Sequence, residues 1–308
     1  MAATNPASSN RGATPLATRP DLVAASSPAQ SLRRPRRMVQ RPAQFWVGLA
    51  IILFILAVAL FAEQIAPHDY TKQTLTIAMR PPAWMEGGDW SYPLGTDRLG
   101  RDLLSRLMVG ARVSTAVGVF SVLLGGAIGI ALGMVAGYFG GWADRFISRL
   151  MDIQLSFPPV FLAIAIIAAL GQSLTNLIVV LGLVSWVQYA RVTRGQTLSL
   201  RGQEFILAAQ AIGIGTGRLL LRHLLPSVLP PLAVIATVNM SAMILNEAAL
   251  SFLGLGVQPP TPAWGSMVAE GRAIMTVAWW NAVFPGAAIA LFVIGGNLMG
   301  DGLTRARR

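Results

Sequence analysis

Cysteine and histidine are almost missing from this sequence of 308 residues. It contains no Cys and only two His, His68 and His223. Without thiols the chain forms neither disulfides nor thiolate metal sites, although this does not settle its compartment. The membrane topology predicted below puts the two histidines on opposite sides of the bilayer, which excludes a paired-His site. We therefore expect no metal site.

Lysine is also scarce, because Lys72 is the only one. No G-x-x-x-x-G-K-[ST] motif is present, so the chain lacks a P-loop and we do not expect it to hydrolyse ATP. The segment 213–217, GIGTG, follows no strand and indicates a helix break. We find no Ser–His–acid set and no intramembrane pair of aspartates. The sequence thus predicts a protein that is not an enzyme and binds no cofactor itself.

Charged residues make up only 12% of the chain, whereas 54% are hydrophobic and the mean hydropathy is +0.58. These values are typical of membrane proteins. We predict an all-α membrane protein with six transmembrane helices. The predicted spans are Phe45–Phe61, Val113–Gly137, Ile153–Leu170, Leu174–Ala190, Val228–Leu253 and Ala282–Gly300.

The net charge of +11 raises the question of a nucleic-acid partner, but its distribution argues against one. Residues 1–44, 138–149, 191–226 and 301–308 hold 17 basic and 4 acidic groups; residues 62–110 and 257–280 hold 6 basic and 7 acidic groups. The positive-inside rule then predicts that both termini are cytoplasmic. Membrane lipid is the expected partner of this charge, with no nucleic acid.

The predicted organisation has three parts. Residues 1–43 are rich in Ala, Ser, Pro and Arg, and we expect a disordered basic cytoplasmic tail. Residues 44–303 form the transmembrane domain, with a first outer (periplasmic) loop at 62–111 and a cytoplasmic loop at 191–227. Residues 304–308 form a short basic tail. The first apolar run resembles a signal peptide, but its length and the later spans favour an uncleaved anchor.

The cytoplasmic loop contains the longest polar interruption among the C-terminal apolar runs, from Arg201 to Pro231. Its residues indicate two short amphipathic helices separated by a glycine-rich break, with a basic rim. We expect Pro226 to end the second helix, and Pro230 and Pro231 to begin the next. The candidate docking residues for a soluble partner are Glu204, Phe205, Ala208, Ala209, Gly213, Gly215, Arg222 and Pro226. The alternative is an ordinary loop that packs on its own bundle.

The outer loop carries the second marked segment, residues 95–106, GTDRLGRDLLSR. Asp97, Arg101, Asp102 and Arg106 have a spacing that allows ion pairs on a short interfacial helix. We interpret this segment as a structural cap over the outer end of the bundle; contact with a soluble protein on that side is the alternative. Its candidate residues are Gly95, Thr96, Asp97, Gly100, Arg101 and Asp102.

Two further patterns lie inside the predicted spans. Gly125, Gly129, Gly133 and Gly137 recur every four residues and predict a face on which another helix packs closely. The fifth span contains Asn239, Asn246 and Glu247, which are candidates for a translocation path because polar groups in a span are costly. For Glu247 we favour a structural role, solvated at the outer end or bonded to Asn246 or another helix, over direct contact with a substrate.

Several of these segments resemble one family, the permeases of binding-protein-dependent ABC importers, in its dipeptide, oligopeptide and nickel branch. The cytoplasmic loop is similar to the family motif E-A-A, three residues, Gly, nine residues, Ile-x-Leu-Pro. It departs from that motif at Leu207 and His223 as this branch does, and Glu204 corresponds to the acid of the branch. Further matching segments are 95–106, 140–145, 151–158, 250–265 and 297–303. The branch's R-D-x-L-D-P does not follow Leu303.

The resemblance implies a type I ABC importer permease of the bacterial inner membrane that works by alternating access. It implies a second, similar permease, two cytoplasmic ATPases carrying ATP and Mg²⁺, and a periplasmic or lipid-anchored binding protein. The loop Glu204–Gly217 would transmit closure of the ATPases. Short peptides are the expected cargo; nickel, glutathione or another small solute is the alternative. A passive channel or ion-driven carrier is a different class, and an intramembrane enzyme fits least.

Overall fold

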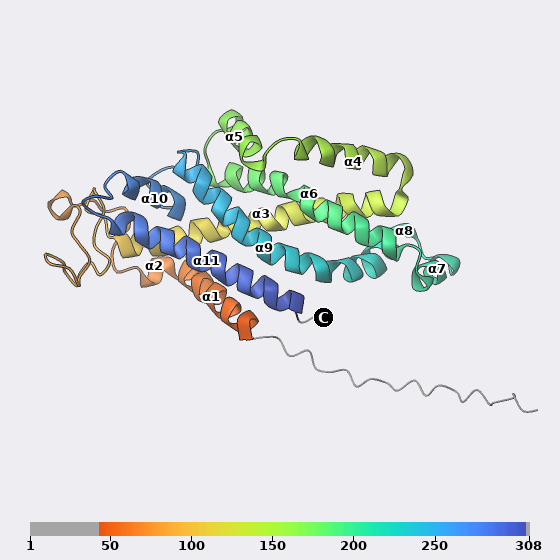
Figure 1. The fold of residues 1–308 in the computed structure, drawn as a ribbon, viewed down its shortest axis with the longest axis horizontal. Helices are drawn as coiled ribbons and strands as arrows, with labels where there is room; N and C mark the ends of the chain where they lie inside the picture. The colour runs from red at the N-terminus through yellow and green to blue at the C-terminus, as the bar shows by residue number, and fades with distance from the viewer. Residues whose placement is uncertain (1–42, 306–308) are drawn as a thin grey trace, which may run out of the picture. The chain divides into compact units, whose positions relative to one another are not determined.

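Five long helices form the body of the protein in a computed structural model that describes residues 43–305 (Figure 1). The predicted tail, residues 1–43, lies outside the described residues except for Ala43, which begins the first helix, and residues 306–308 lie outside them too. The first predicted span corresponds closely to the first helix, and the helices at the second, fourth, fifth and sixth predicted spans extend beyond at least one predicted end. The long helices are α1 (Ala43–Leu60), α3 (Leu103–Phe139), α6 (Leu174–Leu200), α9 (Leu225–Phe252) and α11 (Trp280–Arg305).

The predicted third span is the second half of a bent pair, α4 (Gly141–Leu155) and α5 (Pro159–Leu170), whose axes differ by 90°. Pro158 precedes α5 and Pro159 is its first residue, so neither amide could continue the α4 hydrogen-bond ladder. With α5 only about 18 Å long, it does not cross a hydrocarbon core of about 30 Å by itself. Six spans therefore result when the bent pair is counted as one.

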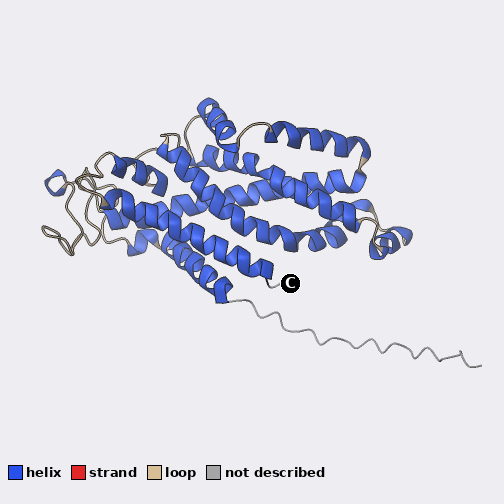
Figure 2. Cartoon of the chain, viewed as in Figure 1, coloured by secondary structure: helices blue, strands red, loops and turns tan. Residues whose placement is uncertain are grey.

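Short helices fill the connections between these long ones, and the described residues contain no strand (Figure 2). At one end of the bundle lie α2 (Ala62–Ile65), a 3-10 turn (Leu75–Ile77) and α10 (Trp264–Arg272). At the other end lie α7 (Glu204–Ala211) and α8 (Thr216–Leu219). The first group surrounds the predicted outer segment, and the second forms the predicted docking loop.

The prediction that Pro226 ends a helix is wrong. A π-helical turn, Leu220–Leu224, joins α8 to α9 without a break, and Pro226 is the second residue of α9. In that turn the Leu225 amide donates to the Leu220 carbonyl, one residue further back than in an α-helix. The widened turn precedes the proline, which lacks an amide to donate. Pro230 and Pro231 then lie inside α9 rather than at its start.

Glycines allow a close contact between α3 and α6, which is the most extensive contact between two described helices. A Cβ atom on Gly129 would lie 2.4 Å from the Trp186 carbonyl oxygen, and one on Gly133 would lie 2.5 Å from that of Ala190. The structure thus places the four-residue glycine pattern, including Gly125 and Gly137, against one neighbouring helix. We call this contact the α3–α6 seam.

Two apolar clusters flank the seam and hold the remaining helices. One contains Val117 of α3, Leu181 of α6 and Leu232 of α9, and α5 joins it through Ile167. The other contains residues of α1, α3, α10 and α11, among them Ile52, Leu103, Trp264 and Phe292. Each cluster packs apolar side chains of several helices together. The two clusters therefore hold the long helices, and the loops at their ends, in fixed positions.

The seam predicts a difference between two neighbouring glycines of α3. Gly129→Ala forces a methyl group into the Trp186 carbonyl and should lower stability by about 1–3 kcal/mol. Gly126→Ala is the matched control, because its methyl group meets nothing closer than Tyr189 at 3.9 Å. Thermal unfolding in detergent measures both variants. Equal melting temperatures for the two would contradict the assignment of the seam.

Candidate functional site

The docking loop buries one side of its short helices and leaves the other free. Ile206 and Ala209 of α7 pack on Leu219 and Leu224, and Tyr138 and Leu200, at the ends of α3 and α6, join this cluster. Because the loop has a small core of its own that touches two spans, it is an anchored element rather than a loose connection.

The free side of the loop is apolar. Ile212 and Leu221 are 77% and 65% exposed, and Phe205 and Leu207 are also exposed. Ala208 and Glu204 are exposed as well. Of the docking candidates on α7, only Ala209 is buried, in the core of the loop. Several large apolar side chains exposed on one loop are typical of a protein–protein contact.

Polar contacts tie the loop to the end of α3. Gln210 Nε2 donates to the Tyr138 hydroxyl at 3.2 Å, and Arg201 Nη1 donates to the Gly137 carbonyl at 3.4 Å. Nearby, Arg194 of α6 forms an ion pair with Asp144 of α4, in which Nη2 and Oδ2 are 2.8 Å apart. These contacts connect the loop to α3, and the ion pair connects α6 to α4.

The remaining predicted loop residues have distinct positions. Gly213 has φ +77°, the left-handed conformation that glycine adopts easily, and follows the end of α7. Gly215 precedes α8 with an ordinary extended conformation. Arg222 and Pro226 are exposed on the π-helical turn and the start of α9. Seven of the eight predicted residues are thus exposed, and Ala209 is buried in the core of the loop.

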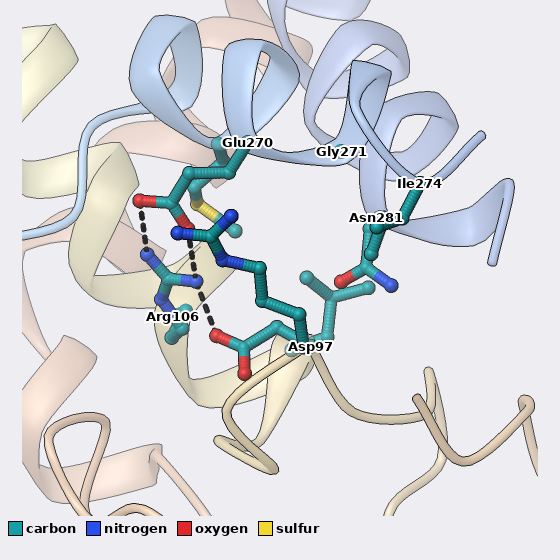
Figure 3. Close-up of a pocket in the computed structure, with 9 residues that line it drawn as sticks. Asp97, Arg106, Glu270, Gly271, Ile274 and Asn281 are labelled. Carbon is teal, nitrogen blue, oxygen red and sulfur yellow. Dashed lines mark hydrogen bonds and ion pairs between the residues drawn. The ribbon is translucent and has the colours of Figure 1, made fainter. Parts of the chain in front are cut away.

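At the opposite end, four charged side chains form a compact ion-pair network, and Figure 3 shows three of them, Asp97, Arg106 and Glu270. Asp97 Oδ2 lies 2.6 Å from Arg101 Nε and 2.5 Å from Arg106 Nη1. Glu270 of α10 contacts the same arginines at 3.1 Å and 2.9 Å. Two positive and two negative charges balance, which is the condition for burying such groups. We call these four residues the mouth network.

The charge spacing had predicted ion pairs on a short interfacial helix, and this prediction is wrong. Residues 95–102 are a loop, and α3 begins at Leu103 with Asp102 as its N-cap. The Asp102 carboxylate accepts from the Ser105 amide at 2.9 Å and from its hydroxyl at 2.6 Å. Asp102 therefore caps a helix instead of pairing with Arg106, because capping satisfies an otherwise free amide.

Backbone geometry explains the glycines and the threonine of this segment. Gly95 and Gly100 have φ +81° and +72°, and a Cβ on Gly100 would lie 1.9 Å from the Thr74 carbonyl. The Thr96 carbonyl accepts from Trp280 Nε1 and Asn281 Nδ2, both at 3.2 Å. The loop is thus fixed to the start of α11. Beside the network remains a cavity of about 10 Å³, which holds about one water molecule.

Glu247 is completely buried and bonds to two serines rather than to Asn246. Its carboxylate accepts from Ser114 of α3 at 3.1 Å and from Ser251 at 2.6 Å, and Ser114 accepts from the Trp264 amide at 3.2 Å. Asn239 is buried two helical turns away, whereas Asn246 is half-buried. The three predicted path residues therefore do not converge, and Glu247 joins α9 to α3 and α10.

Sequence reasoning missed Glu270 as a member of the mouth network. It is the only acid between residues 248 and 300. The available signal was an isolated acid in a loop predicted to lie on the same side of the membrane as Arg98, Arg101 and Arg106. Among the described residues, no group of three metal-ligating side chains gathers.

Comparison with known proteins gives two family matches. Residues 129–306 match the family described as binding-protein-dependent transport system inner membrane component. Residues 36–82 match the N-terminal TM domain of oligopeptide transport permease C. The first match alone covers more than half of the chain.

Relatives match over most of their length. A di/tripeptide transport system permease protein of Pseudomonas aeruginosa (strain UCBPP-PA14) is 46% identical over 84% of this chain and 86% of its own. A dipeptide transport system permease protein of Alkalihalophilus pseudofirmus is 42% identical, covering 84% of each chain. A glutathione transport system permease protein of Escherichia coli O6:K15:H31 is also 42% identical, covering 88% of each.

Solved structures agree on the fold. The inward-facing MetNI methionine ABC transporter contains a chain that matches with a TM-score of 0.51 at 21% identity, covering 65% of this chain and 97% of that one. At this identity the likeness shows the fold alone. It is the type I ABC importer permease fold that the sequence predicted.

The mouth network predicts a cost for removing its outermost acid. Glu270→Gln leaves two buried arginines with one carboxylate, and should lower the free energy of unfolding by about 3 kcal/mol. This is the low end for a broken buried pair, because the Glu270 side chain is 28% exposed. Glu86→Gln in the first loop is the control, since Glu86 is exposed and should change stability by at most about 0.5 kcal/mol. A Glu270→Gln melting curve that matches wild type would contradict the network's structural role.

Proposed function

Because the chain belongs to the family of inner membrane components of binding-protein-dependent transport systems, we propose that it is the permease subunit of an ATP-driven importer of short peptides. It is a multi-pass protein of the inner membrane. The exposed apolar face of the docking loop carries the proposal, because its anchored core suits a lever that a soluble ATPase moves. The relatives named for di- and tripeptide transport support the cargo.

The proposed orientation follows the charge distribution. The docking loop lies on the side with 17 basic and 4 acidic groups, so it faces the cytoplasm, as do both termini. The mouth network then faces the periplasm, where a substrate-binding protein delivers cargo. ATP and Mg²⁺ belong to two cytoplasmic ATPase subunits, and a second permease completes the translocation path. This chain itself catalyses no reaction.

The proposed mechanism is alternating access driven through the docking loop. ATP-dependent closure of the two ATPases moves the loop, and α3 and α6 carry that movement into the bundle through Tyr138, Gly137 and Leu200. Only contacts that differ between the two states of the ATPases shift the equilibrium of the permease. At the far end, the mouth network holds α10 to the start of α3, so these elements move together as the path opens.

Glutathione is the second candidate cargo, because permeases named for glutathione transport are 40–42% identical to this chain. Glutathione is itself a tripeptide, so the two candidates share a chemical class. Nickel remains an alternative from the resemblance of the signature segments. A passive channel or ion-driven carrier would leave the apolar docking face without a partner.

Uptake in a strain deleted for this chain tests the cargo. Labelled dipeptides, tripeptides, glutathione and nickel are supplied in parallel, and the wild-type chain is returned on a plasmid. We expect di- and tripeptide uptake to be lost and then restored. Loss of glutathione or nickel uptake alone would make that solute the cargo, without contradicting the proposal that the chain is a permease subunit. Uptake by the purified chain in liposomes without ATPases would overturn the importer proposal.

The docking face predicts a separation of transport from ATP hydrolysis. Ala208→Glu adds a charge to the exposed side of α7, where it should weaken ATPase contact and lower peptide uptake at least about tenfold without unfolding the bundle. Gly213→Pro should have a similar effect, because proline does not adopt the φ of +77° found there.

Ser199→Glu is the matched control, because Ser199 is exposed on α6 just before the loop. It should transport normally and stimulate ATP hydrolysis normally. Membrane abundance and melting temperature are measured for every variant. Normal uptake by Ala208→Glu and Gly213→Pro would exclude the loop as the lever.

A further inference from the structure

An open apolar groove runs between α1 and α3 near the mouth end of the bundle. Its volume is about 260 Å³, and its walls include Leu56 and Leu60 of α1 and Val119 and Phe120 of α3. Leu60 and Phe120 are 64% and 55% exposed although both lie on membrane-spanning helices. The groove is therefore an indentation in the surface that faces the hydrocarbon.

Polar groups occur at one end of this groove. Arg112 lines it and forms an ion pair with Glu63 of α2, in which Nη1 and Oε1 are 2.5 Å apart. The Arg112 guanidinium also donates to the Ala59 and Leu60 carbonyls, both at 3.3 Å, which fixes it over the end of α1. Thr115, one turn along α3, lines the groove too, and its buried hydroxyl has no hydrogen-bond partner among the described residues.

A second cavity, of about 330 Å³, continues from Glu63 towards the first loop. It is lined by Glu63, His68, Asp69, Tyr70 and Val109. Hydrogen bonds from the Thr71 side chain and backbone lower the pKa of Asp69, so its carboxylate is charged at neutral pH. Lys72 attracts Asp69 weakly, and the His68 ring stacks on Tyr92 and lies 3.6 Å from Asp102. Two carboxylates thus line a polar cavity directly above an arginine and an apolar groove.

The apolar groove, the arginine at its end and the two carboxylates of the cavity match the acyl chain, phosphate and cationic group of one phospholipid. We propose that the groove and the cavity together bind a phospholipid whose headgroup carries a phosphate and a primary ammonium. An acyl chain occupies the groove, the phosphate lies at Arg112, and the ammonium lies between Glu63 and Asp69. The proposal is independent of the cargo.

Charge complementarity selects this headgroup over the other common ones. A phosphatidylglycerol headgroup would bring a phosphate and hydroxyls, but no cation, to two carboxylates. A phosphatidylcholine headgroup brings a cation whose methyl groups exclude N–H donation to carboxylate oxygens. A primary ammonium has three donors and forms the charge-assisted hydrogen bonds that are the strongest available here. The Thr115 hydroxyl gains an acceptor in the ester region of the lipid.

The test measures lipid binding to the whole importer complex, purified from membranes and delipidated in mild detergent. Native mass spectrometry gives apparent Kd values for phosphatidylethanolamine, phosphatidylglycerol and phosphatidylcholine. We expect wild type to bind phosphatidylethanolamine about tenfold more tightly than the other two, the equivalent of one charge-assisted hydrogen bond. The Glu63→Gln variant should lose this preference. The Thr115→Val variant should bind all three lipids more weakly, by the same factor.

Glu86→Gln, an exposed acid of the same loop outside both cavities, should bind lipid as wild type does. If Glu63→Gln fails to assemble, Asp69→Asn replaces it, because Asp69 belongs only to the polar cavity and the groove stays intact. Equal affinity of wild type for the three lipids overturns the proposal. So does a preference that survives both variants, or cross-linking that finds a protein subunit seated over Leu60 and Phe120.

Discussion

The contact between α3 and α6 is so close that no side chain fits at Gly129 or Gly133. Inside a bilayer, apolar side chains gain little by leaving lipid, so van der Waals contact between backbones is a main source of helix association. Both regions of functional interest depend on this contact. The mouth network begins at the first turn of α3, and the docking loop follows the last turn of α6. The seam therefore gives the two ends of the molecule a common support.

Polar groups at both ends of the short helix α10 help to hold it in place. Its first residue, Trp264, donates to Ser114, which in turn donates to the buried Glu247. Near its end, Glu270 pairs with two arginines. Nine residues are too few for a stable isolated helix. Bonds at both ends, together with the burial of Trp264 and Met267, compensate for that weakness.

Sequence periodicity and family motifs predicted the all-α bundle, because apolar runs of membrane length and repeated glycines are direct consequences of the lipid environment. They also gathered the docking-loop residues into one region. They failed at Pro226, because a π-helical turn shifts the hydrogen bonds ahead of the proline and leaves no mark in composition. They also assigned Asp97 and Asp102 to one helix. Equal spacing of charges does not reveal that Asp102 caps a helix which Asp97 precedes.

The length of α3 restricts how this chain can change over generations. Its 37 residues extend about 55 Å, nearly twice the hydrocarbon thickness, and they hold Arg106 at one end and Tyr138 at the other. Each residue turns a helix by about 100°. Insertion of a single amino acid would therefore rotate Arg106 out of phase with the glycine face and with Tyr138. A substitution in α3 away from the glycine face changes one contact, whereas a change in the number of residues alters the phase of every contact beyond it.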